Sequence, residues 1–120
     1  QPVDGVSILP LLTNPDGQLD REYVYWHFPA YLQRYPGLPE PGPFRTTPAS
    51  AVRDDQWKLI HFYETDTNEL YRVAGDLSEE HNIAAQNPEV VERLSTALHR
   101  WVKETGGFVP TELNPEYIAN

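Results

Sequence analysis

The sequence predicts an α+β fold: a four-stranded antiparallel sheet with one long C-terminal helix packed on one face. Short segments rich in aromatic and β-branched residues follow one another at hairpin spacing between residues 22 and 73. A single stretch with helical periodicity covers residues 88–105. Proline-rich and turn-forming segments separate these elements and leave no room for another long one.

The first twenty residues predict a linker followed by a turn. Ser7 is a candidate cap for a short apolar turn, and the letters NPDG at 14–17 combine four residues that favour tight turns. The sequence also contains no methionine. We therefore expect Gln1 to be an internal position of a longer protein.

The first strand is expected from about Glu22 to Phe28, where Pro29 ends it. Successive side chains of a strand point to opposite faces, so Tyr23, Tyr25 and His27 share one face. Val24, Trp26 and Phe28 share the other face. Both faces are apolar, which predicts that both are covered.

Three further strands complete the predicted sheet. Ala49 to Arg53 and Trp57 to Glu64 flank a turn at residues 54–56, and Glu69 to Val73 follows the turn letters TDTN. Residues 29–48 precede them and are too rich in proline for a long helix or a central strand. Ordered loops of this length tend to be functional.

The helix is expected from Pro88 to Thr105, with Asn87 as its cap and Gly106 ending it. It is about 27 Å long, enough to cross one face of a four-stranded sheet. Its apolar stripe comprises Val90, Val91, Leu94, Leu98, Trp101 and Val102. One helix covers only one face, so the second cover is the proline-rich loop, a second copy of the chain or a domain on the N-terminal side. The alternative is that aromatic rings on that face stay half exposed.

Composition excludes several classes of function. Nine basic and eighteen acidic residues give a net charge of −9, which disfavours binding to nucleic acid or to anionic membranes. The absence of cysteine excludes disulfides and thiolate chemistry. No apolar run reaches the roughly 20 residues of a membrane helix.

The sequence contains no strong catalytic motif. Its four histidines lack the spacing of a metal site, and no phosphate-binding loop or G-x-S-x-G motif occurs. Asp54 and Asp55 are adjacent but fall in a predicted turn, where a solvated structural role is expected. His27 stands apart because it ends a strand beside the long loop. It either serves a functional site there or hydrogen-bonds the backbone.

Four stretches, in order, resemble the C-terminal part of the type I sulfatases, the arylsulfatase-like enzymes of the alkaline phosphatase superfamily. DGVSILPLL (Asp4 to Leu12) is similar to the linker of that family, and YWHFP (Tyr25 to Pro29) to the strand after it. AVRDDQWKLI (Ala51 to Ile60) is similar to its hairpin. The stretch 69–84 resembles its E-L-Y-N-L-x-x-D-P-x-E-x-x-N-L-A motif, with matches at Glu69, Leu70, Tyr71, Asp76, Glu79, Asn82 and Ala84.

The resemblance spans nearly the whole chain, with a few departures in the turns. Asp55 stands where the family has a glycine, and Leu77 stands where it has a proline. Arg72 and Val73 replace an Asn-Leu pair. These changes alter local turns and leave the assignment intact.

The resemblance implies a parent sulfatase, a sulfuric ester hydrolase, that is periplasmic or secreted. In that family the N-terminal catalytic domain carries the formylglycine nucleophile and the calcium ligands, and the C-terminal subdomain docks near the substrate cleft. This chain has neither the nucleophile motif nor those ligands, so we expect it to be inactive alone and to contain no metal site or cofactor. Residues 1–20 are then a linker from the catalytic domain, and residues 21–120 are the subdomain.

The expected substrate-binding residues are His27, Tyr31, Arg34 and Arg45, on or beside the long loop. A sulfated small molecule or glycan requires hydrogen-bond donors, and arginine binds such anions through paired N–H groups. The expected partner is the catalytic domain, with self-association through the uncovered sheet face as a second possibility.

Two other classes of function remain open at this stage. A carbohydrate-binding or interaction module would display Tyr31, Tyr35 and Phe44 on the loop over a closed core. A subdomain would instead leave an apolar sheet face open. An independent enzyme is the weakest hypothesis, because no nucleophile and base are paired.

Overall fold

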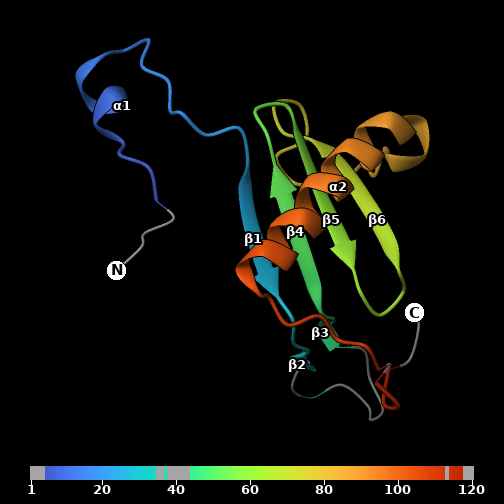
Figure 1. The fold of residues 1–120 in the computed structure, drawn as a ribbon. Coiled ribbons are helices and arrows are strands. Elements are labelled where there is room, and N and C mark those ends of the chain that lie inside the picture. Colours follow the sequence, from blue (N-terminus) through green and yellow to red (C-terminus); the bar gives the residue numbers. More distant parts are fainter. Residues whose placement is uncertain (1–4, 35–36, 38–43, 113, 118–120) are drawn as a thin grey trace.

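The computed structural model describes residues 5–34, 37, 44–112 and 114–117 (Figure 1). Its main sheet has four antiparallel strands, and α2 (Pro88–Thr105) lies across one face. The order in space is β1 (Val24–Phe28), β4 (Ala49–Arg53), β5 (Trp57–Phe62) and β6 (Thr67–Arg72). The predicted fold class is confirmed, and the first strand pairs with the meander as its outer member.

Four short elements complete the described fold: α1 (Leu9–Thr13), β2 (Leu32–Arg34), β3 (Phe44–Thr46) and the 3₁₀ turn η1 (Ala84–Gln86). β2 and β3 form a separate two-stranded sheet within the proline-rich loop. The sequence did not predict this sheet, because three-residue strands are too short to show an alternating pattern. α1 stands apart from the main sheet, on an arm that leads into β1 (Figure 1).

The core lies between the sheet and α2. Val52, Leu59 and Leu70 from the sheet are fully buried against Leu94, Leu98 and Val102 of the helix. At one side of this layer, Trp101 stacks on Tyr25 with ring centroids 4.7 Å apart and planes 4° from parallel. The predicted helical stripe therefore faces the sheet, although Val90, Val91 and Trp101 are only partly buried.

The ends of α2 differ in how well they were predicted. Asn87 precedes the helix, but its side chain makes no capping hydrogen bond, and its Nδ2 instead donates to the carbonyl of Ile83, 2.9 Å away. Asn87 therefore stands at the predicted cap position, but the prediction that its side chain caps the helix is wrong. At the other end Gly106 adopts a left-handed conformation with φ of 67°, which glycine accepts without strain.

The second face of the sheet is covered only in part. Trp26 is 49% exposed and Phe28 is 46% exposed, and both lie on the face away from α2. Next to β6 the same face is closed by the segment 73–82, where Lys58 pairs with Glu79 at 2.5 Å and Tyr71 is buried. Within the described residues, the predicted missing cover is thus confined to the β1 side.

The two edge strands of the sheet, β6 and β1, differ in the hydrogen bonding of their outer backbone groups. At β6, the backbone N–H of Leu70 donates to Asn82 Oδ1 at 3.2 Å, and the N–H of Ile83 donates to the carbonyl of Leu70 at 2.9 Å. In the part of the chain that the structure describes, no backbone hydrogen bond joins the outer edge of β1 to another segment. β1 is therefore the open edge.

Leu98→Ala is expected to lower the free energy of unfolding by about 2–5 kcal/mol, because it leaves a cavity in a layer where the side chain is fully buried. Urea denaturation followed by circular dichroism measures the change. Leu77→Ala is the control, because Leu77 is 90% exposed and should shift stability by less than about 0.5 kcal/mol. Equal effects from the two substitutions would contradict the assignment of the core.

Candidate functional site

Polar side chains gather at the end of the sheet where β1 and β5 finish and β4 begins. The strand register places His27 opposite Ser50, and Ser50 opposite His61. Tyr63 follows β5 directly, so it shares their face of the sheet. We call His27, Ser50, His61 and Tyr63 the polar cluster. The β2–β3 sheet and the chain after α2 lie at the same end of the molecule (Figure 1).

A chain of hydrogen bonds runs through the polar cluster. His27 Nε2 lies 2.8 Å from the carbonyl oxygen of Phe108, which can only accept, so Nε2 carries the proton. In the neutral ring Nδ1 then accepts from the hydroxyl of Ser50 at 2.6 Å. That hydroxyl accepts in turn from Tyr63, 2.8 Å away. Ser50 is buried, so this pairing satisfies a group that would otherwise be costly to bury.

Gly107 brings the chain after α2 close to His27. Its N–H donates to the carbonyl of Val102 at 2.9 Å. A Cβ at this position would lie 3.2 Å from His27 Nε2 and 3.1 Å from Val102 Cγ1. A side chain here would require these neighbours to move by a few tenths of an ångström, and the close approach brings the Phe108 carbonyl within hydrogen-bond distance of His27.

Tyr31 makes a second tie at the same end. Its hydroxyl donates to Glu64 Oε2, and the backbone N–H of Asn114 approaches the same oxygen at 3.5 Å. Burial and the neighbouring Glu64 carboxylate raise the pKa of Tyr31 to about 12, so the hydroxyl keeps its proton. The Tyr31 ring packs on Phe44, with centroids 4.9 Å apart. Tyr31, just before β2, is thus tied to β3 through Phe44 and to the chain near residue 114 through Glu64.

The structure brings two of the four predicted site residues to adjacent positions. His27 contacts Tyr63, and Tyr31 contacts Glu64, the next residue in the chain. Arg45 is exposed in the middle of β3. Arg34 ends β2 opposite Phe44, and its side chain lies outside the described part of the structure. Tyr35 also lies outside the described residues.

His61 and His99 meet where the sheet faces α2. Their rings are perpendicular with centroids 5.0 Å apart, and His61 also meets Tyr63 edge-on at 4.8 Å. Burial, and then the nearby His61, lower the pKa of His99. The His99 side chain is exposed, but one edge packs on His61.

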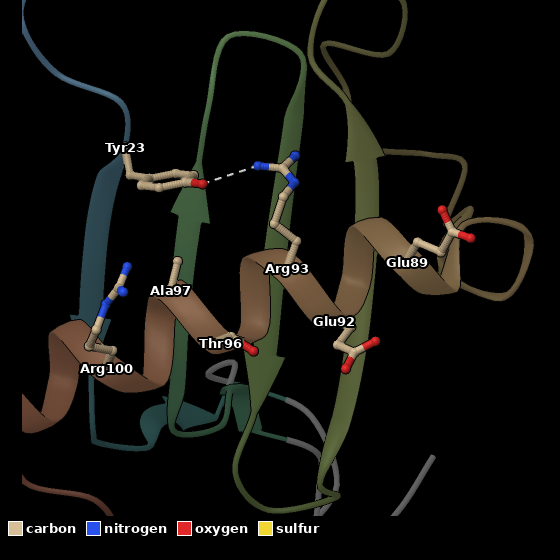
Figure 2. A pocket seen from close by; sticks show the side chains of 7 residues that line it. All are labelled: Tyr23, Glu89, Glu92, Arg93, Thr96, Ala97 and Arg100. Carbon is tan, nitrogen blue, oxygen red and sulfur yellow. Dashed lines mark hydrogen bonds between the residues drawn. The ribbon is translucent and has the colours of Figure 1, made fainter.

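A separate hollow of about 380 Å³ lies between Tyr23 and the outer flank of α2 (Figure 2). Arg93 crosses it, donating to Tyr23 at 3.2 Å and to Asp54 Oδ2 at 2.8 Å. Asp54 also accepts from the N–H groups of Gln56 and Trp57. Burial raises the pKa of Asp54, but these hydrogen bonds outweigh burial, so the pKa is lowered. The turn is not simply solvated as predicted, since Asp54 ties it to the helix.

The described residues place limits on the chemistry of this chain. Among them, no group of three or more His, Asp or Glu side chains is arranged to hold a metal ion. None of the helices in this part of the chain is long and apolar enough to span a membrane. Within the polar cluster, His27, Ser50 and Tyr63 pair with one another, which suits a positioning role better than a nucleophilic one.

Sequence inspection missed Ser50, Tyr63 and Glu64 as partners of the predicted residues. A signal was present, since antiparallel pairing of the two predicted hairpin strands with the first strand places Ser50 beside His27. The Phe108 carbonyl and Gly107 had no comparable signal. Their contacts depend on the path of the chain after α2.

Comparisons with known proteins agree on one family. The model for the C-terminal region of N-sulphoglucosamine sulphohydrolase matches residues 1–105. A curated relative from Formosa agariphila, named a sulfatase, is 30% identical over 114 residues, a match that covers 85% of this chain and 19% of the relative. The structure of BT4656 in complex with its substrate, D-glucosamine-2-N,6-O-disulfate, matches with a TM-score of 0.55 and 26% identity, over 86% of this chain and 20% of that one. The chain thus spans about a fifth of the length of these relatives.

The lowered pKa of His99 predicts a stability that depends on pH. Because the folded-state pKa lies below the unfolded value of about 6.5, the unfolded chain binds more protons when the solution is acidified. The contribution is present above about pH 6.5 and is lost as pH falls through the folded pKa. Urea denaturation at pH 7.5 and pH 5.5 measures it. His99→Gln should reduce the difference between the two pH values. An unchanged difference in His99→Gln would contradict the assignment.

Proposed function

The chain belongs to the N-sulphoglucosamine sulphohydrolase C-terminal family, and we propose from this that it is the C-terminal subdomain of a sulfatase, completing the fold and the rim of the substrate cleft. The parent protein is then a sulfuric ester hydrolase that acts on a sulfated sugar. The observation that carries the proposal is the apolar sheet face at Trp26 and Phe28, which α2 leaves uncovered. This chain spans about a fifth of the length of its relatives. In a parent protein of that length, the other four-fifths would supply the partner that covers this face.

The main alternative, a free-standing carbohydrate-binding module, has less support. Such a module would have a closed core and would display its aromatic rings on the loop. Here Tyr31 and Phe44 pack on each other and are half buried. The exposed rings belong instead to Trp26 and Phe28 on the sheet and to Phe108 after α2. A second copy of the chain is the other candidate partner for that face, and sedimentation velocity of the 120-residue chain distinguishes it from docking to the parent protein.

The proposed division of the chain places a linker at 1–20 and the subdomain at 21–120. Its support is the packing, because in the part of the chain that the structure describes the buried hydrophobic core begins at Val52, with Tyr23 and Tyr25 packed against it. The arm before β1 carries exposed apolar side chains, including Ile8, Leu9 and Leu12. Those side chains suit packing against the parent protein.

The chemistry of sulfate-ester cleavage is assigned to the rest of the parent. A formylglycine nucleophile and a calcium ion are the groups expected there. The residues of this chain do not fit either group, because the sequence has no C/S-x-P-x-R motif and its described part offers no metal-ligand cluster. We therefore assign no step of the reaction to the residues of this chain.

The proposed rim consists of His27, Tyr31, Arg34 and Arg45. His27 ties the end of the sheet to the chain after α2 through the Phe108 carbonyl, and Tyr31 ties the start of the long loop to Glu64, just after β5. Arg45 is exposed on β3, and Arg34 lies on β2, the strand that pairs with it. Guanidinium groups suit a sulfate group, because they offer paired N–H donors.

The docking proposal predicts that Trp26→Glu destabilises the full-length protein more than the 120-residue chain. In the chain alone the side chain is already half exposed, whereas docking would bury the introduced charge. Thermal melts of both forms, with and without the substitution, measure this, and sedimentation velocity reports self-association of the short form. Aryl sulfate turnover is expected only from the full-length form. Turnover by the short form, or equal melting shifts in both forms, would contradict the proposal.

The rim proposal predicts that Arg45→Gln raises KM for a sulfated glucosamine in the full-length protein while the melting temperature stays unchanged. A lost charge-assisted contact is worth about 1.5–3 kcal/mol, which corresponds to a rise of roughly ten- to a hundredfold. Arg53→Gln is the matched control, because Arg53 is an exposed arginine at the opposite end of β4. An unaltered KM, or a similar rise in the control, would remove Arg45 from the rim.

A further inference from the structure

We propose that a hollow beside the polar cluster binds a sugar ring that carries an acidic group. The hollow has a volume of about 450 Å³ and lies between the end of β5, the last turns of α2 and the chain that follows. Its lining includes His61, Tyr63, Asp66, His99, Val102 and Lys103. None of the four proposed rim residues lines it, so this site goes beyond the proposed function.

The size and the lining of the hollow suit a small ring. Pockets for small molecules commonly measure 300–1,000 Å³ and combine apolar walls with a few polar groups. Here the rings of Tyr63 and His99 both stand nearly perpendicular to His61, at 86° and 89°. These rings and the aliphatic Val102 line the hollow, and apolar groups of this kind suit packing against the C–H face of a sugar ring.

His61 supplies a hydrogen-bond acceptor inside the hollow. Its side chain is only 8% exposed, and its Nδ1 lies 3.1 Å from Asn68 Oδ1, an acceptor, so Nδ1 carries the proton of the neutral ring. Nε2 therefore presents a lone pair. Its nearest charged neighbour is Asp66 Oδ1 at 4.0 Å, beyond hydrogen-bond distance and itself an acceptor. A ligand hydroxyl is the group that pairs with this nitrogen.

Two opposite charges at the lining define the rest of the ligand. Asp66 is 95% exposed at its side chain and accepts hydrogen bonds, which suits further hydroxyl groups. Lys103, from the last turn of α2, supplies an ammonium group that pairs with an anion. The lowered pKa of His99 keeps that ring uncharged at neutral pH, so Lys103 is the main cation of the lining. A hydroxylated ring with one acidic substituent matches this set.

The hollow also contacts the segment that the polar cluster holds. Gly107 lines it, and the next residue, Phe108, accepts the hydrogen bond of His27. Tyr63 belongs both to the lining and to the cluster. A bound sugar would therefore touch the segment fixed by His27 without contacting that histidine.

Proton NMR of the histidine rings in the 120-residue chain tests the proposal, with N-acetylglucosamine 6-sulfate as the probe. Single His→Gln variants assign the four resonances. Saturable shifts are expected at His61 and His99, and none at the distant His81. N-acetylglucosamine without the sulfate should bind about tenfold more weakly, and sodium sulfate alone should not reproduce the shifts. These readouts do not depend on sulfatase activity, so they remain informative if the proposed function fails.

Two variants separate the groups involved. Lys103→Gln should weaken binding of the sulfated sugar about tenfold and leave that of the neutral sugar unchanged, whereas Arg53→Gln, at an exposed arginine away from the hollow, should change neither. His61→Phe keeps a ring but removes Nε2, so it should weaken both sugars, as followed at His99. If His61→Phe does not fold, Lys103→Gln and the unmodified chain still decide the question. Absence of saturable shifts, shifts reproduced by sulfate alone, or affinities for the sulfated sugar unaffected by Lys103→Gln would overturn the proposal.

Discussion

The packing of one helix against one face of the sheet is the constraint on which the other features depend. Four strands spaced about 4.8 Å apart make a sheet roughly 15 Å wide, and a helix with its side chains is about 10 Å across. α2 crosses this width diagonally and buries Leu94, Leu98 and Val102 against the strands (Figure 1). The chain has no second long helix in its described part. The far face at β1 therefore stays open, and the chain after α2 is delivered to the polar end of the sheet.

The interior changes in character along the strands. Near the middle of the sheet it consists of aliphatic side chains, while at the end where β1 finishes it becomes a set of paired polar groups. Burying Ser50 is tolerable because hydrogen bonds within the polar cluster satisfy its hydroxyl, and the buried His61 pairs through Nδ1 with Asn68 on the neighbouring strand. This polar end joins the long loop, the sheet and the chain after α2, three segments that are distant in sequence. Such a junction suits a surface whose shape must be fixed, which is the reason to place a substrate rim there.

Much of the fold was predictable from the sequence, whereas little of the site was. The helix Pro88–Thr105 and the strand Ala49–Arg53 were predicted with their observed bounds, because their periodicity and flanking glycine, proline and aspartate residues are local signals. The motif at 69–84 also has a local explanation, since Asp76 accepts from two backbone N–H groups and Asn82 closes the edge of β6. The partners of His27 and Tyr31 come from segments 23 to 81 residues away. Contacts at that separation follow from the folded path and leave no periodic trace in the sequence.

The open edge at β1 has a consequence for the colloidal behaviour of the chain. The outer edge of β1, a strand of five residues that includes Trp26 and Phe28, is a template on which another extended chain can pair, and Pro29 keeps that template short. The net charge of −9 opposes such encounters by repulsion between copies. At an ionic strength of 1 M the screening length falls to about 3 Å, and the repulsion no longer reaches between approaching molecules. Solubility of the chain by itself is therefore expected to fall as salt is added. Salt has the opposite effect on aggregates held together by surface ion pairs, because it weakens those contacts.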